Sequence, residues 1–213
     1  MTLTVKPADF HIQVSRRADR PLDQAEPITV SPTVQTTGSP AAGNAHHTPL
    51  AVLFGSTLGT AEGIANRLAQ EGTERGYEIA LGSLDEHVDQ APAKAAIIVC
   101  ASYNGLPPDN AVKFHHALNE AGPTAYEDLS YTVFGCGNTE WAETYQAVPT
   151  QLDAGLEQHG ATRIHPRGAG DARGDFDAAY RNWHDTLWQD VGTALGVDAP
   201  HETDESQPRL AIT

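Results

Sequence analysis

The chain has 213 residues, and its 13 basic and 28 acidic side chains give a formal net charge of −15 at pH 7. This length suggests one domain with appended segments. The acidic balance argues against partners that are themselves anionic, such as nucleic acid or a membrane surface, and it favours a protein partner with a basic face.

Two cysteines, Cys100 and Cys136, lie inside apolar segments. They predict no disulfide framework and are consistent with a reducing compartment. The longest apolar run, Ala95 to Ala101, is too short to span a bilayer. Because no signal-peptide pattern opens the chain either, we expect a cytoplasmic protein without a membrane partner.

Residues 1 to 47 differ in composition from the rest of the chain. Two short runs of alternating apolar and polar residues, 3–5 and 10–14, form a candidate hairpin. Because a lone hairpin is not stable by itself, residues 1–16 are interpreted as the end of another domain. Residues 17–47 are rich in Pro, Ser and Thr without apolar periodicity, which is typical of a linker.

From residue 48 onward, strand and helix patterns alternate. The apolar runs predict strands at Leu50–Phe54, Tyr77–Leu81, Ala95–Ala101, Tyr131–Cys136 and Thr162–His165. The helical patterns predict helices at Thr60–Arg75, Asn110–Ala121, Tyr145–His159 and Phe176–Leu195, the last with an apolar face of Phe176, Tyr180, Trp183, Leu187 and Val191. This alternation indicates an α/β fold with a parallel sheet covered on both faces. A ligand is then expected at the carboxyl ends of the strands, across the switch point between the first and third strands.

A loop of Gly, Ser and Thr residues joins the first strand to the first helix. Its amides and the positive end of the helix dipole predict an anion site. No Lys or Arg occurs between Phe54 and Asn66, which argues against a Walker-type nucleotide site, and the glycine spacing is not the dinucleotide fingerprint. Neutral donors from Ser56, Thr57 and Thr60 suit a terminal phosphate monoester. An ordinary strand-to-helix turn is the alternative.

The third and fourth strands each end in a loop that carries one aromatic residue beside small residues and Asn. Tyr103 follows the third strand and Trp141 follows the fourth. Two aromatics from facing loops suit a flat conjugated ring stacked between them. Gly105 and Gly137 would let the backbone approach the edge of that ring. For either aromatic alone, packing on its own neighbours is the simpler explanation.

These three loops carry a resemblance to a known family. Gly-Ser-Thr-Leu-Gly-Thr-Ala, Ala-Ser-Tyr-Asn-Gly-Leu-Pro-Pro-Asp-Asn and Phe-Gly-Cys-Gly-Asn-Thr-Glu-Trp-Ala-Glu-Thr-Tyr resemble the flavin loops of the FMN domain in diflavin reductases. The closer resemblance is to the FMN domain of bacterial self-sufficient cytochrome P450 monooxygenases that are fused to their reductase. It implies a flavodoxin-like, three-layer, five-stranded parallel sheet of order 2-1-3-4-5 over residues 48–197.

The resemblance also implies a domain order and partners. Residues 1–16 are similar to the end of a haem domain, 17–47 to the linker after it, and 198–213 to a linker towards a FAD/NADPH domain. The implied partners are these haem and FAD/NADPH domains, and the implied parent carries FMN, FAD, NADPH and haem. The implied function is electron transfer from the reductase domain to the haem, singly, through FMN. This piece alone would turn over neither NADPH nor a monooxygenase substrate.

The family's flavin contacts can be placed residue by residue. The first loop would hold the FMN phosphate through Ser56, Thr57, Leu58, Gly59, Thr60 and Ala61. The other two loops would contact the ring through Ser102, Tyr103, Asn104, Gly105, Leu106, Cys136, Gly137, Asn138, Thr139, Trp141 and Tyr145. Asn138 departs from the family, in which an acidic residue is expected. Candidates for an acidic docking surface near the site are Glu62, Glu140, Glu143, Asp171 and Asp175.

Other functions remain to be weighed. A free-standing flavodoxin that shuttles electrons fits the same loops, and the N-terminal segment argues against it. A flavin-binding or interaction module without redox function is a further alternative. A response-regulator receiver is excluded because no acidic cluster stands at the strand ends. The adjacent histidines at 46–47 and 115–116 cannot converge on a metal, so neither a metal site nor a catalytic residue is predicted.

Overall fold

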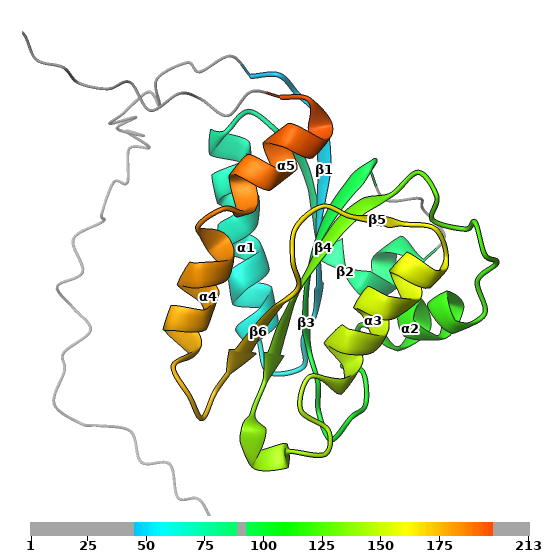
Figure 1. The fold of residues 1–213 in the computed structure, drawn as a ribbon, viewed down its shortest axis with the longest axis vertical. Coiled ribbons are helices and arrows are strands. Elements are labelled where there is room, and N and C mark those ends of the chain that lie inside the picture. Colours follow the sequence, from blue (N-terminus) through cyan, green and yellow to red (C-terminus); the bar gives the residue numbers. More distant parts are fainter. Residues whose placement is uncertain (1–44, 89–92, 198–213) are drawn as a thin grey trace, which may run out of the picture. The chain divides into compact units, whose positions relative to one another are not determined.

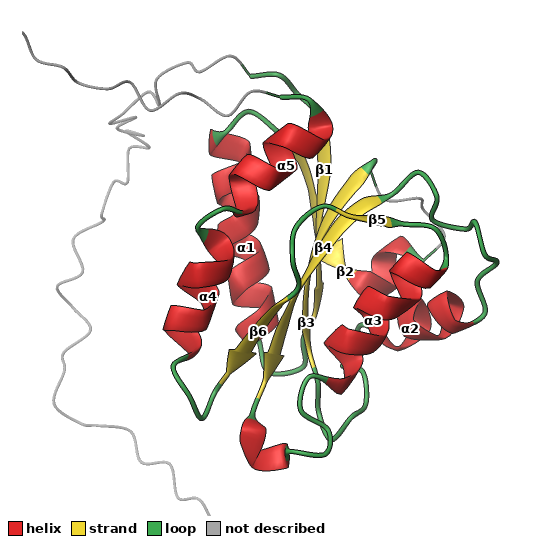
Figure 2. Ribbon diagram, viewed as in Figure 1, coloured by secondary structure: helices red, strands yellow, loops and turns green. Residues whose placement is uncertain are grey.

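The computed structural model describes residues 45–88 and 93–197. The predicted domain remnant (1–16), nearly all of the predicted linker (17–44) and the predicted second linker (198–213) lie outside the described residues. Figures 1 and 2 show the described part as a twisted sheet between two layers of helices.

The sheet confirms the predicted fold class and strand order. Its strands are β1 Pro49–Gly55, β2 Glu78–Ser83, β3 Ala95–Ala101, β4 Ser130–Gly137, β5 Thr162–Arg163 and β6 Gly168–Asp171. The order is β2-β1-β3-β4-β5, with β6 also pairing with β4, and all pairings are parallel. The buried apolar runs in β1 and β3 explain their central positions, because a parallel strand covered on both faces has no exposed side.

The register aligns the carboxyl ends of β1, β3, β4 and β6 at one edge of the sheet. Gly55 pairs with Cys100, Ala101 pairs with Cys136, and Gly137 pairs with Asp171. The loops that leave β1, β3, β4 and β6 therefore start side by side at one edge of the sheet, as the topological argument predicts.

Two apolar cores lie on the two faces of the sheet. The helices are α1 Thr60–Glu74, α2 Val112–Asn119, α3 Ala147–Gln158, α4 Phe176–His184 and α5 Leu187–Leu195, with short 3₁₀ turns at Leu84–His87 and Thr139–Trp141. Leu50 and Val52 of β1 face α1, α4 and α5, whereas Ala51 and Leu53 face α2 and α3. Alternate residues of each strand thus enter opposite cores, which is the three-layer arrangement visible in Figure 1.

The single C-terminal helix predicted over 176–195 is wrong, because the structure has two helices. Helix α4 ends at His184 and α5 begins at Leu187, with Asp185 and Thr186, residue types of low helix propensity, between them. The predicted apolar face is correct, since its residues from both helices pack into the same core. The break leaves both α4 and α5 over that face.

The fifth strand also departs from the prediction. Pairing with β4 stops at Arg163 and resumes in β6, a strand that the sequence reading missed. Glycine disfavours strands, but here it is needed, since a Cβ at Gly168 would lie 2.4 Å from the Phe134 ring and one at Gly170 would lie 2.3 Å from the Phe176 ring. Between the two strands the buried His165 turns away, with its Nδ1 2.6 Å from the Asp190 carboxylate.

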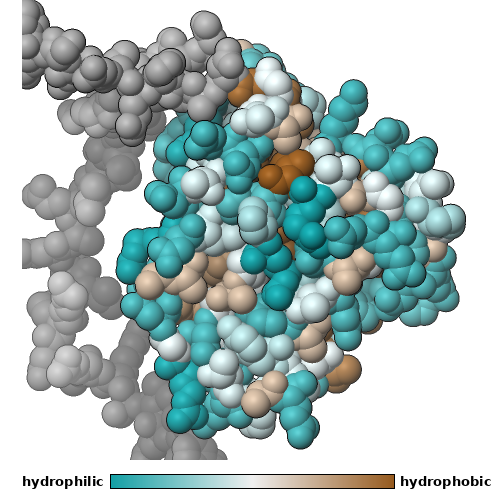
Figure 3. All heavy atoms as spheres, in the orientation of Figure 1, coloured by the Kyte–Doolittle hydropathy of each residue, from teal (hydrophilic) through white to brown (hydrophobic). Residues whose placement is uncertain are grey.

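The surface of the described part is largely polar. Figure 3 shows hydrophilic residues over most of one face, with apolar residues scattered between them. Among the described helices, none combines the length and the apolar character needed to cross a membrane.

Candidate functional site

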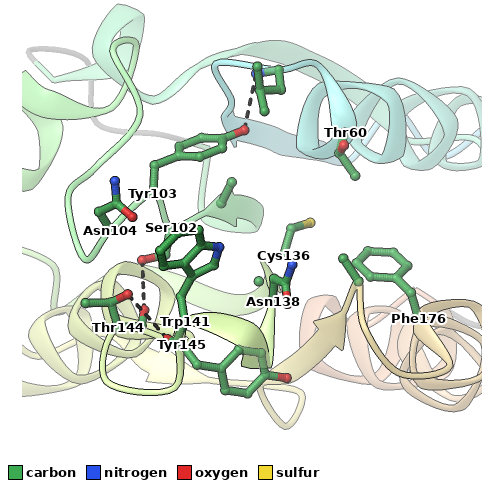
Figure 4. Close-up of a pocket in the computed structure, with 14 residues that line it drawn as sticks. Thr60, Ser102, Tyr103, Asn104, Cys136, Asn138, Trp141, Thr144, Tyr145 and Phe176 are labelled. Atoms are coloured by element: carbon green, nitrogen blue, oxygen red, sulfur yellow. Dashed lines mark hydrogen bonds between the residues drawn. The ribbon is translucent and has the colours of Figure 1, made fainter. Parts of the chain in front are cut away.

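The loops after β1, β3, β4 and β6 surround one pocket of about 570 Å³ at the carboxyl edge of the sheet. Its lining residues are Leu58, Thr60, Ala101, Ser102, Tyr103, Asn104, Cys136, Gly137, Asn138, Trp141, Thr144, Tyr145, Ala172 and Phe176. Figure 4 shows Thr60 on one side of the pocket and Asn138, Trp141 and Tyr145 on the opposite side. A pocket therefore lies where the ligand was predicted, at the carboxyl ends of the strands, and loops far apart in the sequence form it.

The first loop presents backbone donors at the start of α1. Gly59 precedes the helix with a left-handed φ of 90°, and within the described residues no side chain caps this helix end. The first helical N–H groups, at Thr60 and Ala61, have no partner inside the helix and are open to an anion. The Ser56 hydroxyl accepts a hydrogen bond from Gly59 N at 2.9 Å, which leaves its own proton free to donate.

Side chains from the second loop hold the first loop in place. Asn110 Oδ1 accepts from Ser56 N at 2.8 Å, and Tyr103 Oη accepts from Leu58 N at 3.2 Å. Thr57 Oγ1 accepts from Asp109 N at 3.4 Å. Asn110 was not among the predicted site residues. Its signal in the sequence is only an Asn placed before a helix, which is more often read as a cap.

The second loop is a tight turn. Asn104 and Gly105 both have positive φ, 51° and 77°, and Tyr103 and Leu106 exchange backbone hydrogen bonds of 3.2 and 2.9 Å. Two left-handed central residues define a type I′ turn, which Asn-Gly favours. Leu106 is left 67% exposed at its end. The turn points the Tyr103 side chain into the pocket and the Leu106 side chain towards solvent.

The third loop carries the second aromatic. Asn138 caps the short 3₁₀ turn by accepting from Glu140 N at 2.8 Å, so this residue, where the resemblance implies an acidic one, has a local structural role. Trp141 lines the pocket and is 60% exposed. Gly137 lies close to the Tyr145 ring, since a Cβ there would lie 3.0 Å from it.

The structure separates the predicted site residues into two groups. Ten line the pocket: Leu58, Thr60, Ser102, Tyr103, Asn104, Cys136, Gly137, Asn138, Trp141 and Tyr145. Seven do not line it, namely Ser56, Thr57, Gly59, Ala61, Gly105, Leu106 and Thr139. The Ala61 side chain is fully buried in the core, so only its backbone can take part. Thr139 turns away from the pocket towards Asp171.

The sequence reading missed four lining residues, Ala101, Thr144, Ala172 and Phe176. Ala172 follows the unpredicted strand β6, and Phe176 opens α4, so both reach the pocket only because β6 pairs with β4. Nothing in their local sequence distinguishes them from ordinary core or loop residues.

The titratable groups at the pocket differ in their environment. Burial raises the pKa of the Cys136 thiol to about 12, so the thiol in the pocket wall is neutral at pH 7. Hydrogen bonds from the Thr139 backbone and hydroxyl lower the pKa of the Asp171 carboxyl, which is therefore ionised. The described residues contain no group of three or more His, Cys, Asp or Glu side chains placed to hold a metal.

The acidic candidates near the site are not equivalent. Asp171 binds the third loop, Asp175 caps α4 by accepting from Ala178 N at 2.8 Å, and Glu140 lies 4.0 Å from Arg173. The side chains of Glu62 and Glu143 make no hydrogen bond or ion pair with any residue in the described ranges. Of the five candidates, these two carboxylates are the ones without such a partner among the described residues.

The chain is similar to a known family model and to known proteins. The flavodoxin family model matches residues 52–183. A bifunctional cytochrome P450/NADPH–P450 reductase of Bacillus subtilis is 39% identical over 99% of this chain, and a self-sufficient cytochrome P450 monooxygenase of Phanerodontia chrysosporium is 39% identical over 88% of it. The chain spans about a fifth of the length of these relatives, 20% and 18% respectively.

Solved structures support the fold. A cysteine-to-alanine mutant of flavodoxin from Pseudomonas aeruginosa superimposes with a TM-score of 0.54 at 24% identity, covering 70% of this chain and 97% of that one. A short-chain flavodoxin associated with a bacterial microcompartment gives a TM-score of 0.57 at 19% identity, with coverages of 68% and 97%. The predicted flavodoxin-like fold and the predicted resemblance to P450–reductase fusions are both confirmed.

Proposed function

The chain belongs to the flavodoxin family, and on this premise we propose that it is the FMN domain of a cytochrome P450 monooxygenase fused to its reductase. In this role it takes electrons from a FAD/NADPH domain and passes them singly to the haem. The observation that carries the proposal is the extent of the match. Similarity to the fusion proteins covers 99% of this chain, well beyond the 52–183 span of the flavodoxin model.

FMN, which the fold and the relatives support as the cofactor, fits the residues at the pocket. An anion finds neutral donors at the first loop, where Ser56 and the open amides of Thr60 and Ala61 stand at a helix N-terminus. A flat ring finds the aromatic side chains of Tyr103 and Trp141 in the pocket wall.

When bound, FMN supplies one- and two-electron transfer, and the protein supplies position and electrostatics. We assign Ser56 to Ala61 to the phosphate, and Tyr103 and Trp141 to the two sides of the ring. The neutral Cys136 thiol forms part of the wall and exchanges no proton at pH 7. The pocket-lining Trp141 side chain is exposed, so a redox partner can approach closely.

Charge steering is the proposed means of encounter. Glu62 lies in the first turn of α1, close in sequence to the lining residue Thr60, and Glu143 lies between the lining residues Trp141 and Thr144, so we propose that these two carboxylates flank the pocket. Complementary charge raises association rates more than affinity, which suits a domain that must meet two partners in turn. We propose that these partners are the haem and FAD/NADPH domains of the same parent, in the cytoplasm.

A free-standing electron carrier is the second candidate. It is favoured by the flavodoxin structures, which are covered almost completely by about 70% of this chain. The fusion proteins account for more of the sequence, because their similarity extends over 99% of the chain.

The test is an NADPH-driven relay with the chain loaded with FMN and the separate FAD/NADPH and haem domains of the Bacillus subtilis relative. We expect haem reduction, followed as the carbon monoxide complex, to require the chain and to slow as salt is added. Glu62→Gln with Glu143→Gln should slow the relay several-fold at low salt and leave FMN affinity unchanged. Glu78→Gln, at the opposite end of the sheet, is the matched control. A chain that binds FMN but relays no electrons between these domains would contradict the fusion role and favour the free-standing carrier.

A further inference from the structure

We propose that Asp171 is a positioning residue that fixes the third loop, and with it Trp141, from the end of β6. This inference rests on the proposed function, because it assigns a role in holding the flavin site. Asp171 ends β6 and does not line the pocket. Its carboxylate instead reaches across to the loop that follows β4.

Both carboxylate oxygens are used inside the molecule. Oδ1 accepts from Thr139 N at 2.9 Å and from Arg173 N at 3.0 Å, and Oδ2 accepts from Thr139 Oγ1 at 2.7 Å. Backbone donation from Ala172 N to Gly137 O at 2.8 Å adds a further link between the two segments. Hydrogen bonds to an ionised acceptor are stronger than those between neutral groups. We call this contact between the Asp171 carboxylate and Thr139 the clamp, because it restrains the third loop.

The clamp holds the segment that forms one wall of the pocket. Thr139 stands between Gly137 and Trp141, which both line the pocket, although Thr139 itself does not. Trp141 N donates to Asn138 O at 3.1 Å. The backbone segment that Asp171 holds therefore also fixes the position from which the Trp141 side chain projects. Releasing Thr139 would let the 3₁₀ turn move as a unit. The structure therefore assigns Thr139 to the support of the loop rather than to the cofactor.

Charge alone does not explain this arrangement. Arg173 and Glu140 are the other charged groups beside the clamp, and they lie 4.0 Å from each other with both side chains more than half exposed. Asp177, in the first turn of α4, carries the same charge as Asp171 a few residues away and is exposed. A role in steering partners predicts similar effects from both aspartates, whereas a clamp predicts an effect from Asp171 alone.

The experiment compares Asp171→Ala, Asp171→Asn and the control Asp177→Asn, first without FMN and then with it. In the FMN-free protein, Asp171→Ala should speed hydrogen exchange at the Thr139 and Trp141 amides about tenfold, the loss expected for a charge-assisted backbone contact. With FMN, the same variant should raise the Kd about tenfold and leave more flavin fluorescence unquenched at saturation. Asp171→Asn should fall between, since its side-chain carbonyl can still accept from Thr139 N. Asp177→Asn should match the wild type.

Two results would overturn the proposal. Unchanged amide exchange in Asp171→Ala would mean that the clamp does not restrain the loop. Faster exchange with unchanged Kd and quenching would mean that the restrained loop does not position the flavin. A wild-type chain that binds no FMN would instead refute the proposed function. The hydrogen-exchange rates of the FMN-free variants would still show whether Asp171 restrains the loop. Because Asp171 is at the surface, thermal melts should show each variant folded, and Thr139→Val offers a second, milder removal of the Oδ2 contact.

Discussion

The two thiols are among the side chains whose pKa is raised most by folding. Cys100 is fully buried and Cys136 is 5% exposed, and desolvation raises the pKa of both from an ordinary value of 9.0. Both thiols are neutral in the native state over the physiological range. The folded state therefore keeps these two protons at a pH where the unfolded chain releases them.

A pH dependence follows with a definite sign. Below about pH 9 the thiols are protonated in both states and contribute no slope to the free energy of unfolding. Between pH 9 and about 12 the unfolded thiols ionise while the native Cys136 does not, so stability falls by up to about 1.4 kcal/mol per pH unit for each thiol.

Urea unfolding of the wild type and of Cys100→Ala with Cys136→Ala, at several pH values from 7 to about 11, checks this expectation. The double variant should be less stable at pH 7 because it leaves cavities, but its stability should decline less steeply above pH 9. Parallel curves for the two proteins would contradict the assignment of the slope to the thiols.

At the scale of elements, β6 and α4 pack so closely that glycine is required between them. The site depends on this contact, because Phe176 lies in the pocket wall and Gly170 lies directly beneath its ring. The same packing aligns Ala172 and Asp171 with the loop after β4. A short strand of small residues thus supports one side of the pocket.

Gly170→Ala is expected to destabilise the fold by about 1–3 kcal/mol and to weaken FMN binding, because the new Cβ would lie 2.3 Å from Phe176 Cε2. Gly63→Ala is the matched control. Its Cβ, in the first turn of α1, would meet no atom within 4 Å, so it should be neutral or stabilise by up to about 1 kcal/mol. Urea midpoints measure both. Equal stability for Gly170→Ala and the wild type would refute the packing argument.

At the scale of the whole molecule, the predictable and unpredictable features have different physical origins. The parallel sheet and the position of the pocket follow from apolar runs such as Ala95–Ala101 and from the rule that ligands bind at the carboxyl ends of parallel strands, whereas the strand order came from the family resemblance. Strand β6 was missed because Gly168 and Gly170 disfavour strands, and only the rings packed on them explain their presence.

The site shows the same division. Tyr103 and Trp141 could be predicted because aromatics stand at strand ends, where a ligand is expected. Asn110 and Asp171 could not, because their contacts to Ser56 and Thr139 join segments that are distant in sequence. Residues that touch the pocket are thus easier to infer than the residues that hold those loops in place.

The central claim is that the pocket of this fold binds FMN. The most direct measurement is the absorption spectrum of the purified chain, followed by release and identification of its chromophore. The account predicts a flavin spectrum and about one FMN per chain, taken up again by the stripped protein with quenching of the flavin fluorescence. A colourless chain that leaves the fluorescence of added FMN unchanged would contradict the account.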